Sequence, residues 1–261
     1  MRTPNCPALP KTESVAAVDD LPAALARLGL GSARPVLVSV GGAGGLDAVI
    51  AEHLLVLFRD RLAPLLNQLG AAVVDGGTDA GVMSLMGEAR RAAGAEYPLL
   101  GVAARGTVRL PGEPTDRGAA LEPNHSHRLL VPGHTWGDEI PWMNAVAALL
   151  SADCGSATLV SSGGRITACD VDASLAHGRS TLLLANSGGT ADAIARAGVR
   201  HPLVQVVSSD NGWCGLDSAL QRLLGAGTAL GRALRPDLLP DVRSDAQAGA
   251  EDDEDRDVSD T

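Results

Sequence analysis

The feature that most constrains the fold is an alternation between short, continuous apolar runs and longer segments with helical spacing. Parallel strands that are buried on both faces consist of continuous Val, Leu and Ala runs, because the connecting helices cover both sides of the sheet. The sequence therefore predicts a single-domain α/β fold, a Rossmann-like, doubly wound and mainly parallel sheet with helices on both faces. The predicted strands span residues 36–40, 71–75, 98–104, 127–132, 157–162, 181–186 and 202–208.

The residues outside this alternation set the predicted domain limits. Residues 1–34 are expected to form an N-terminal arm, loose over residues 1–18, with one short helix. Residues 35–225 are expected to form the folded domain, and 226–261 an acidic, disordered tail that is poor in hydrophobic residues. Pro64 is predicted to divide a long helix over 46–69. The stretch 105–123 is irregular, and loops of this length commonly serve a function.

The formal net charge of −10 is concentrated in the tail. From Asp237 to Thr261, ten acids stand against Arg243 and Arg256, a net charge of −8, which leaves −2 for the remainder. A nearly neutral body has no basic surplus with which to neutralise phosphates, so a nucleic-acid partner is disfavoured. Aromatic residues make up only 2% of the chain, which disfavours stacking as the main way of holding a base.

Hydropathy and cysteine spacing favour a cytoplasmic protein. No stretch reaches the ~18 apolar residues of a membrane span, and the N-terminus lacks the apolar core of a signal peptide, so direct membrane insertion is not expected. The four cysteines (Cys6, Cys154, Cys169 and Cys214) show no Cys-x-x-Cys spacing. We therefore expect reduced thiols rather than a disulfide framework or a zinc site.

Paired glycines follow four of the predicted strands. A glycine turn that leads a strand into a helix directs free backbone N–H groups and the positive end of the helix dipole at one point, which suits a phosphate. Parallel strands share their carboxyl edge, so the four turns are predicted to line one crevice there. The alternative is that the glycines only permit tight turns. The pairs are Gly41-Gly42, Gly76-Gly77, Gly163-Gly164 and Gly188-Gly189.

Neither common phosphate signature is present, since no segment matches GxxxxGK[ST] and the turn after residue 40 lacks the third glycine of GxGxxG. An ordinary NTPase or dehydrogenase is therefore disfavoured. Polar side chains also gather around the predicted strand at 127–132, where Asn124, His125, His127 and His134 lie near its two ends. No acid or cysteine stands at metal-ligand spacing, so these histidines are expected to hydrogen-bond ribose or phosphate, or else to cap the strand, rather than to bind metal.

The order and spacing of several segments resemble the SLOG superfamily, specifically the prokaryotic LSDAT group, which is named for its similarity to the N-terminal SLOG domain of TRPM channels. The resemblance covers about residues 36–195, and it includes the Gly163-Gly164 turn. The segments that carry it are GGTDAGVMSLMGEA (76–89), GVAARGTV (101–108), LEPNHSHRLLV (121–131), DEIPW (138–142) and NSGGTADAIA (186–195).

The resemblance implies a Rossmann-like domain that binds an NAD-derived nucleotide, such as ADP-ribose or cyclic ADP-ribose, at the carboxyl edge of the sheet. It assigns three groups of residues to the ligand. The phosphate group comprises Gly76, Gly77, Thr78, Gly81, Val82 and Met83; the second surrounds the ligand and comprises Gly106, Thr107, Asn124, His125 and His127; the third closes the opposite wall and comprises Gly163, Gly164, Thr167, Ser187, Gly188 and Gly189.

The superfamily also contains LOG-type phosphoribohydrolases, in which a GGxGTxxE segment combines a phosphate turn with a catalytic glutamate. The comparable segment here has Ile166 in place of the second glycine and Asp170 in place of the glutamate. A shorter carboxylate is still able to support departure of a base, which makes Asp170 the candidate catalytic residue. The alternatives are that Asp170 is exposed in the first turn of a helix and that Arg165 holds a diphosphate instead.

Three functions remain open from the sequence. The first is a ligand sensor that binds an ADP-ribose-like nucleotide without turnover, needs no cofactor, and acts in signalling as a homo-oligomer or with an effector protein. The second is a hydrolase of N-glycosyl or nucleotide bonds that uses Asp170. The third is a structural or interaction subunit whose pocket is vestigial.

Overall fold

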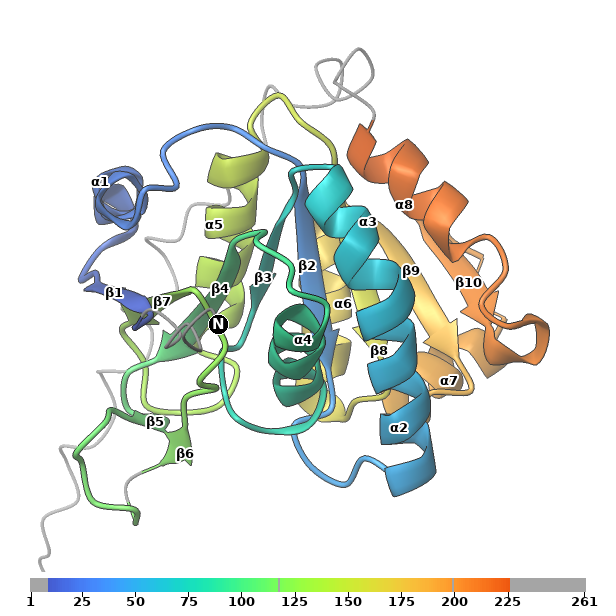
Figure 1. Cartoon of the computed structure of the whole chain (residues 1–261), viewed down its shortest axis with the longest axis horizontal. Helices are drawn as coiled ribbons and strands as arrows, with labels where there is room; N and C mark the ends of the chain where they lie inside the picture. The colour runs from blue at the N-terminus through green and yellow to red at the C-terminus, as the bar shows by residue number, and fades with distance from the viewer. Residues whose placement is uncertain (1–8, 117, 199, 226–261) are drawn as a thin grey trace, which may run out of the picture.

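Eight parallel strands form one sheet in the order β1-β7-β4-β3-β2-β8-β9-β10 in the computed structural model, which describes residues 9–116, 118–198 and 200–225 (Figure 1). The predicted acidic tail lies outside the described residues. Two short strands, β5 (Val108–Arg109) and β6 (Ala119–Ala120), pair separately. The strands of the large sheet are β1 (Lys11–Ser14), β2 (Val36–Gly41), β3 (Ala72–Asp75), β4 (Leu99–Ala104), β7 (His127–Val131), β8 (Ser156–Ser161), β9 (Ser180–Ala185) and β10 (Val204–Ser208).

Helices cover both faces of this sheet, as the sequence predicts (Figure 1). Helices α2 (Ala48–Leu57), α3 (Ala63–Gln68), α4 (Gly81–Ala92) and α8 (Leu216–Gly225) pack on one face. Helices α1 (Leu21–Leu28), α5 (Ile140–Ser151), α6 (Arg165–Ala176) and α7 (Gly189–Arg196) pack on the other. The remaining helical turns are η1 (Val18–Asp20), η2 (Phe58–Leu62) and η3 (Ser209–Asn211).

Each central strand contributes to two separate cores. In β2, Val36, Val38 and Val40 point into the core under α1, α5, α6 and α7, whereas Leu37 points into the core under α2, α3, α4 and α8. Alternate residues face opposite sides of a strand, and both sides here are covered, so every position favours an apolar residue. This explains why the strands are continuous apolar runs in the sequence.

The chain order creates a switch point between β2 and β8. From β2 the chain runs outward through β3, β4 and β7, and it then crosses back to β8 and continues through β9 to β10. Gly41 and Ser161 stand opposite each other at the carboxyl ends of β2 and β8, so the loops that follow diverge from the same level. Ligands of doubly wound sheets bind in the crevice at such a point.

Two predictions near the N-terminal half need correction. Residues 11–14, expected in the loose arm, form the edge strand β1, which pairs with β7; this polar, four-residue strand carries no apolar run to reveal it. The helix predicted over 46–69 is divided into α2 and α3, but the interruption is a π-helical segment at Phe58–Leu62 that ends two residues before Pro64. The wider π turn lets the helix continue past a residue that lacks an N–H group.

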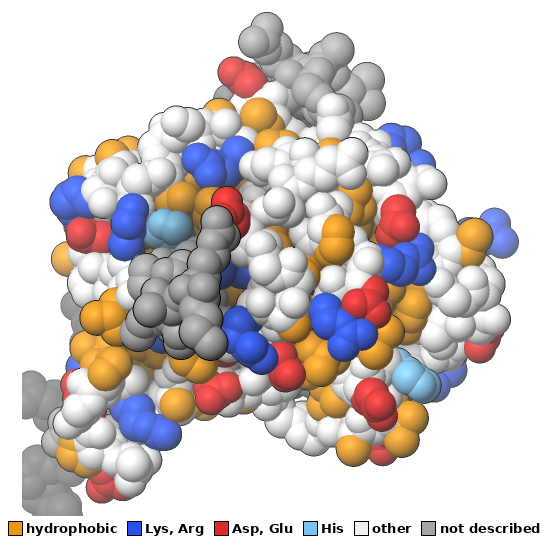
Figure 2. Space-filling view, in the orientation of Figure 1, with side chains coloured by type: hydrophobic (Ala, Val, Ile, Leu, Met, Phe, Trp, Pro, Cys, Tyr) orange, Lys and Arg blue, Asp and Glu red, His pale blue; other side chains and the backbone are white. Residues whose placement is uncertain are grey.

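One face of the molecule carries charged side chains of both signs (Figure 2). Figure 2 shows Lys, Arg, Asp and Glu side chains interspersed over the face of α2, α3 and α8, without a large basic patch on that face. Within the described part of the chain, none of the helices combines the length and the apolar character that crossing a membrane requires.

Two of the glycine turns pack loops against each other. Gly81 has a φ of +49°, and a Cβ atom there would lie 1.8 Å from the carbonyl oxygen of Gly42. Gly189 has a φ of +54°, and its Cβ would lie 2.1 Å from the carbonyl oxygen of Gly163. The glycines at these positions therefore permit close contact between backbones. This agrees with the alternative to phosphate binding, that glycines serve tight packing.

We predict that Gly81→Ala lowers the free energy of unfolding by at least about 2 kcal/mol, because the new Cβ adds a backbone clash to the cost of a positive φ. Gly94→Ala is the matched control: Gly94 also has a positive φ, +61°, but nothing lies within 4 Å of its Cβ position. We expect this control to cost about 1 kcal/mol. Urea denaturation measures both, and equal losses would contradict the role assigned to the close approach.

Candidate functional site

A cavity of about 340 Å³ lies at the switch point, against the carboxyl ends of β2, β3 and β4. Its floor is formed by the ends of these strands, and its walls by the loop at 41–44, by the turn at 76–78, by the start of α5 and by the first turns of α6. The volume is at the lower end of the range for small-molecule sites. The cavity therefore lies where the topology predicts a ligand, and it is large enough to enclose much of one.

Four helices follow the glycine turns, and the N-terminus of α6 is the most open of them. At α2, Asp47 Oδ1 caps the helix by accepting from the N–H groups of Val49 and Ile50. At α7, the N–H groups of Thr190 and Ala191 already donate to the carbonyl groups of Gly163 and Ser162. At α4, the N–H group of Val82 donates to Gly42, 3.0 Å away. The first N–H groups of every helix lack intrahelical acceptors. At α6 no side chain caps the N–H groups of the first turn, which belong to residues 165–167.

A positive and a negative region meet in this cavity. Exposed Arg165 and the α6 N-terminus supply the positive region, since the helix dipole concentrates positive charge there. Asp170 and Glu139 supply the negative region, with only 8% and 9% of their surface exposed. The site can therefore hold an anion at the start of α6 and accept hydrogen bonds deeper inside.

Asp170 is a buried carboxyl group in an unusual electrostatic environment. Burial and the neighbouring charge of Glu139 raise its pKa to about 7. Its Oδ1 atom has no hydrogen-bond partner within the described structure. Burial likewise raises the pKa of Glu139, whose Oε2 accepts a 3.0 Å hydrogen bond from the Gly137 N–H group. The alternative that Asp170 is an exposed surface residue is therefore wrong.

About half of the site residues predicted from the sequence line the cavity, and the others do not. Gly41-Gly42 and parts of two other glycine pairs reach the cavity, but the Gly188-Gly189 pair does not, so the four turns do not line one crevice. The lining residues are Gly41, Gly42, Gly76, Thr78, Met83, Thr107, Gly164, Arg165, Thr167 and Asp170. Outside the lining are Gly77, Gly81, Val82, Gly106, Asn124, His125, His127, Gly163, Ser187, Gly188 and Gly189.

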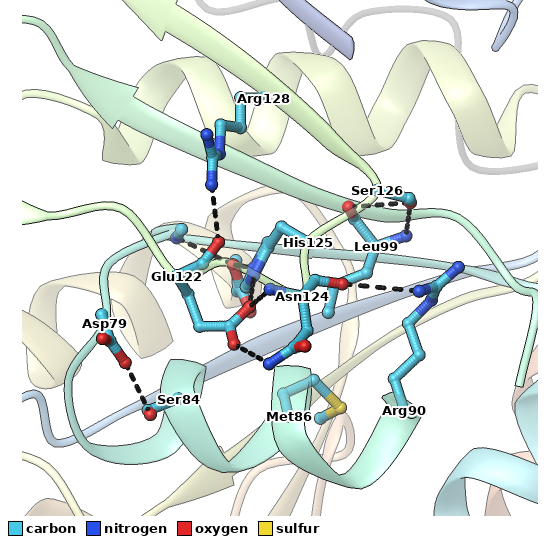
Figure 3. A network of polar contacts seen from close by, with 12 residues as sticks. Asp79, Ser84, Met86, Arg90, Leu99, Glu122, Asn124, His125, Ser126 and Arg128 are labelled. Carbon is cyan, nitrogen blue, oxygen red and sulfur yellow. Dashed lines mark hydrogen bonds and ion pairs between the residues drawn. The ribbon is translucent and has the colours of Figure 1, made fainter. Parts of the chain in front are cut away.

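His125 is fully buried between two carboxylates rather than open to a ligand (Figure 3). Its Nε2 lies 2.8 Å from Asp75 Oδ1, and its Nδ1 lies 2.7 Å from Glu122 Oε2. Burial by itself lowers the pKa of the ring, but the charge and hydrogen bond of Asp75 and the contact with Glu122 outweigh it and raise the pKa to about 9. The ring is therefore an imidazolium that ties two acids together at neutral pH.

This buried network positions the turn that forms one wall of the cavity. Asp75 also accepts a 2.8 Å hydrogen bond from the N–H group of Gly77, and Glu122 donates its own N–H to the Gly77 carbonyl. Gly87 in α4 leaves room for the network, because a Cβ there would lie 2.2 Å from the Glu122 carboxylate. His125 therefore acts on the Gly76-Gly77 turn from behind and does not contact the cavity.

Asn124 and His127 also have structural partners. The Asn124 side chain donates to Glu122 Oε1 at 2.6 Å, and Arg90 of α4 contacts the Asn124 carbonyl, as Figure 3 shows. His127 lies next to β1, where burial and the charge of Lys11 lower its pKa to about 4, so its ring is neutral. Within the described residues, no group of three or more His, Cys, Asp or Glu side chains is placed to hold a metal ion.

Two chemically important residues of the cavity were not singled out from the sequence, Glu139 and Trp136. Both lie in the loop that leads from β7 into α5. The DEIPW segment contains Glu139, but one carboxylate before a helix resembles an ordinary first-turn acid. Burial is what distinguishes Glu139 from such an exposed acid. That burial depends on the packing of α5 against α6, which the sequence pattern does not reveal.

Comparison with solved structures finds similar folds at low sequence identity. An X-ray structure of TM1055, a structural-genomics target, is 22% identical with a TM-score of 0.44, covering 67% of this chain and 91% of that chain. The molybdenum cofactor carrier protein of Chlamydomonas reinhardtii is 18% identical with a TM-score of 0.48, covering 73% and 98%. The molybdenum cofactor binding protein of Rippkaea orientalis is 16% identical with a TM-score of 0.48, covering 72% and 97%.

Comparison with sequences gives one clear assignment. No curated protein sequence matches the chain at a significant level. A family model described as "SLOG in TRPM, prokaryote" matches residues 34–220, which include every described strand from β2 to β10 and all the cavity residues.

We predict that the His125 network makes the protein less stable as the pH rises. The folded-state pKa of about 9 lies above the unfolded value of about 6.5, so the stabilisation is complete below pH 6.5 and is lost as the pH rises through 9. The free energy of unfolding should fall by up to about 3 kcal/mol over this range. Urea denaturation at several pH values between 6 and 9.5 measures the fall.

The His125→Gln variant should lose this pH dependence, because glutamine does not titrate, and it should be less stable than the wild type at pH 6. His53→Gln, on the exposed side of α2, is the control and should behave as the wild type does. A His125→Gln variant with the wild-type pH dependence would contradict the assignment of the charge to His125.

Proposed function

This chain belongs to the SLOG-in-TRPM family of prokaryotes, and we propose that it senses an NAD-derived nucleotide, ADP-ribose or cyclic ADP-ribose, which it binds in the switch-point cavity without turnover. The observation that carries the proposal is the uncapped α6 N-terminus, which opens with Arg165 onto the cavity. Backbone N–H groups at a helix N-terminus and an arginine fork are both suited to a diphosphate.

The negative region of the cavity supports the ribose part of this ligand. The hydroxyl groups of a ribose need hydrogen-bond acceptors, and acidic side chains take this role in many dinucleotide sites. Asp170 Oδ1 is buried and unpartnered within the described structure, so a hydroxyl group placed against it would satisfy an acceptor that is otherwise costly to bury. A nucleotide with phosphates at the start of α6 and a ribose near Asp170 would match both regions.

Calorimetric titration with ADP-ribose, cyclic ADP-ribose, NAD and AMP tests this proposal. We expect saturable binding of an ADP-ribose-type nucleotide and about a 10- to 100-fold weaker affinity in Arg165→Ala, the loss expected for a charge-assisted hydrogen bond to phosphate. Arg91→Ala removes the same charge from the far end of α4 and should leave the affinity unchanged. Absence of binding by all four nucleotides would instead favour a vestigial pocket.

Asp170 supports a second candidate function, the hydrolysis of an N-glycosyl bond. A carboxyl group with a pKa of about 7 is partly protonated at neutral pH, so it can donate a proton to a departing base or, when ionised, stabilise an oxocarbenium-like centre. Burial and a neighbouring carboxylate, which raise this pKa, also surround catalytic carboxyl groups in other enzymes.

Chromatography of the titration mixtures separates the two functions. Under the sensor function no base or ribose phosphate is released. Under the hydrolase function product appears, Asp170→Asn abolishes it while binding is retained, and the rate falls above pH 7 if Asp170 acts as the acid. Product formation that persists in Asp170→Asn would exclude this residue as the catalyst.

A further inference from the structure

Trp136 is an aromatic residue whose side chain does not pack into either core. The chain has five aromatic residues. Phe58, Tyr97 and Trp213 are buried in the core under α2, α3, α4 and α8, and Trp142 packs against the other core. Trp136 instead lines the cavity and leaves 51% of its surface exposed. An indole is a large apolar group to leave in water, which marks its position as one that a ligand can cover.

The loop that carries Trp136 is held by hydrogen bonds on both sides of it. Asp138 Oδ2 accepts from the N–H groups of His134 and Thr135 at 2.8 and 2.9 Å, and Asp138 Oδ1 accepts from the Thr135 hydroxyl at 2.9 Å. Glu139 Oε2 accepts from the N–H group of Gly137 at 3.0 Å. A backbone fixed before and after the indole limits where the ring can go, which lowers the entropy lost on binding.

The same loop lies next to the helix end assigned to the phosphates. A Cβ atom at Gly137 would lie 3.4 Å from Ile166 Cδ1, in the first turn of α6. Trp136, Arg165 and Ile166 all line the cavity. A flat ring that rests on the indole would therefore lie within reach of an anion held at the start of α6, as the base and the phosphates of one nucleotide do.

We propose that Trp136 is a ligand-binding residue whose indole stacks on the base of the nucleotide. The inference rests on the proposed function and adds to it the class of ligand: a phosphorylated compound that carries a planar heteroaromatic ring, rather than a sugar phosphate alone. Stacking on an aromatic side chain contributes affinity for any base, because every base has a π face. The low aromatic content of the chain thus does not preclude stacking at this one position.

Calorimetry of two ligands tests the proposal, because ADP-ribose carries a base and ribose 5-phosphate does not. We expect Trp136→Ala to weaken ADP-ribose binding about 10- to 100-fold and to leave ribose 5-phosphate binding unchanged. Trp136→Phe should retain most of the ADP-ribose affinity. Leu149→Ala, which removes another exposed apolar side chain from α5 outside the cavity lining, is the matched control and should bind both ligands as the wild type does.

Tryptophan fluorescence supplies an independent measurement. ADP-ribose should quench the emission of the wild type and of Trp142→Phe, and the quenching should disappear in Trp136→Phe. Unchanged ADP-ribose affinity in Trp136→Ala, or an equal loss for both ligands, would overturn the stacking role while leaving the proposed function in place. A wild-type protein that binds neither ligand would overturn both.

Discussion

The parallel direction of all eight strands is the constraint on which the rest of this structure depends. Parallel strands need long crossover connections, so helices cover both faces and every carboxyl end meets one edge of the sheet. The crossing from β7 back to β8 then makes the connections diverge beside β2. A cavity between diverging loops follows from this order, and it lies where the helix N-termini also point.

Crowding at this edge gives its glycines two different uses. At Gly81 and Gly189 the missing side chain lets one loop touch the carbonyl oxygen of another, and these contacts satisfy the N-termini of α4 and α7. At Gly164 the helix N-terminus stays uncapped and open to the cavity. Loop packing thus occupies the N-termini of α4 and α7, Asp47 caps α2, and the N-terminus of α6 remains as the one proposed to hold the phosphates.

Buried charge is used in two contrasting ways around this site. Behind the Gly76-Gly77 turn, His125 sits between Asp75 and Glu122, so its charge is compensated and the wall is held in place. Inside the cavity, burial raises the pKa of both Asp170 and Glu139, the charge of Glu139 raises that of Asp170 further, and one oxygen of Asp170 has no partner within the described residues. A buried charge whose partners lie within the protein can hold a backbone turn in place. A buried carboxyl group that lacks a partner can instead accept a hydrogen bond from a ligand.

The sequence alone determined the fold class, most strand positions and the family, because continuous apolar runs and glycine turns depend on local spacing. It also predicted ten cavity residues, among them Arg165 and Asp170. It missed β1, whose four polar residues become a strand only by pairing with β7. Only the tertiary structure placed His125 behind the wall, closed the Gly188-Gly189 turn against Gly163, and brought Trp136 and Glu139 to the cavity. Those outcomes depend on contacts between segments far apart in the chain, and residue spacing does not encode which side chains such contacts bury.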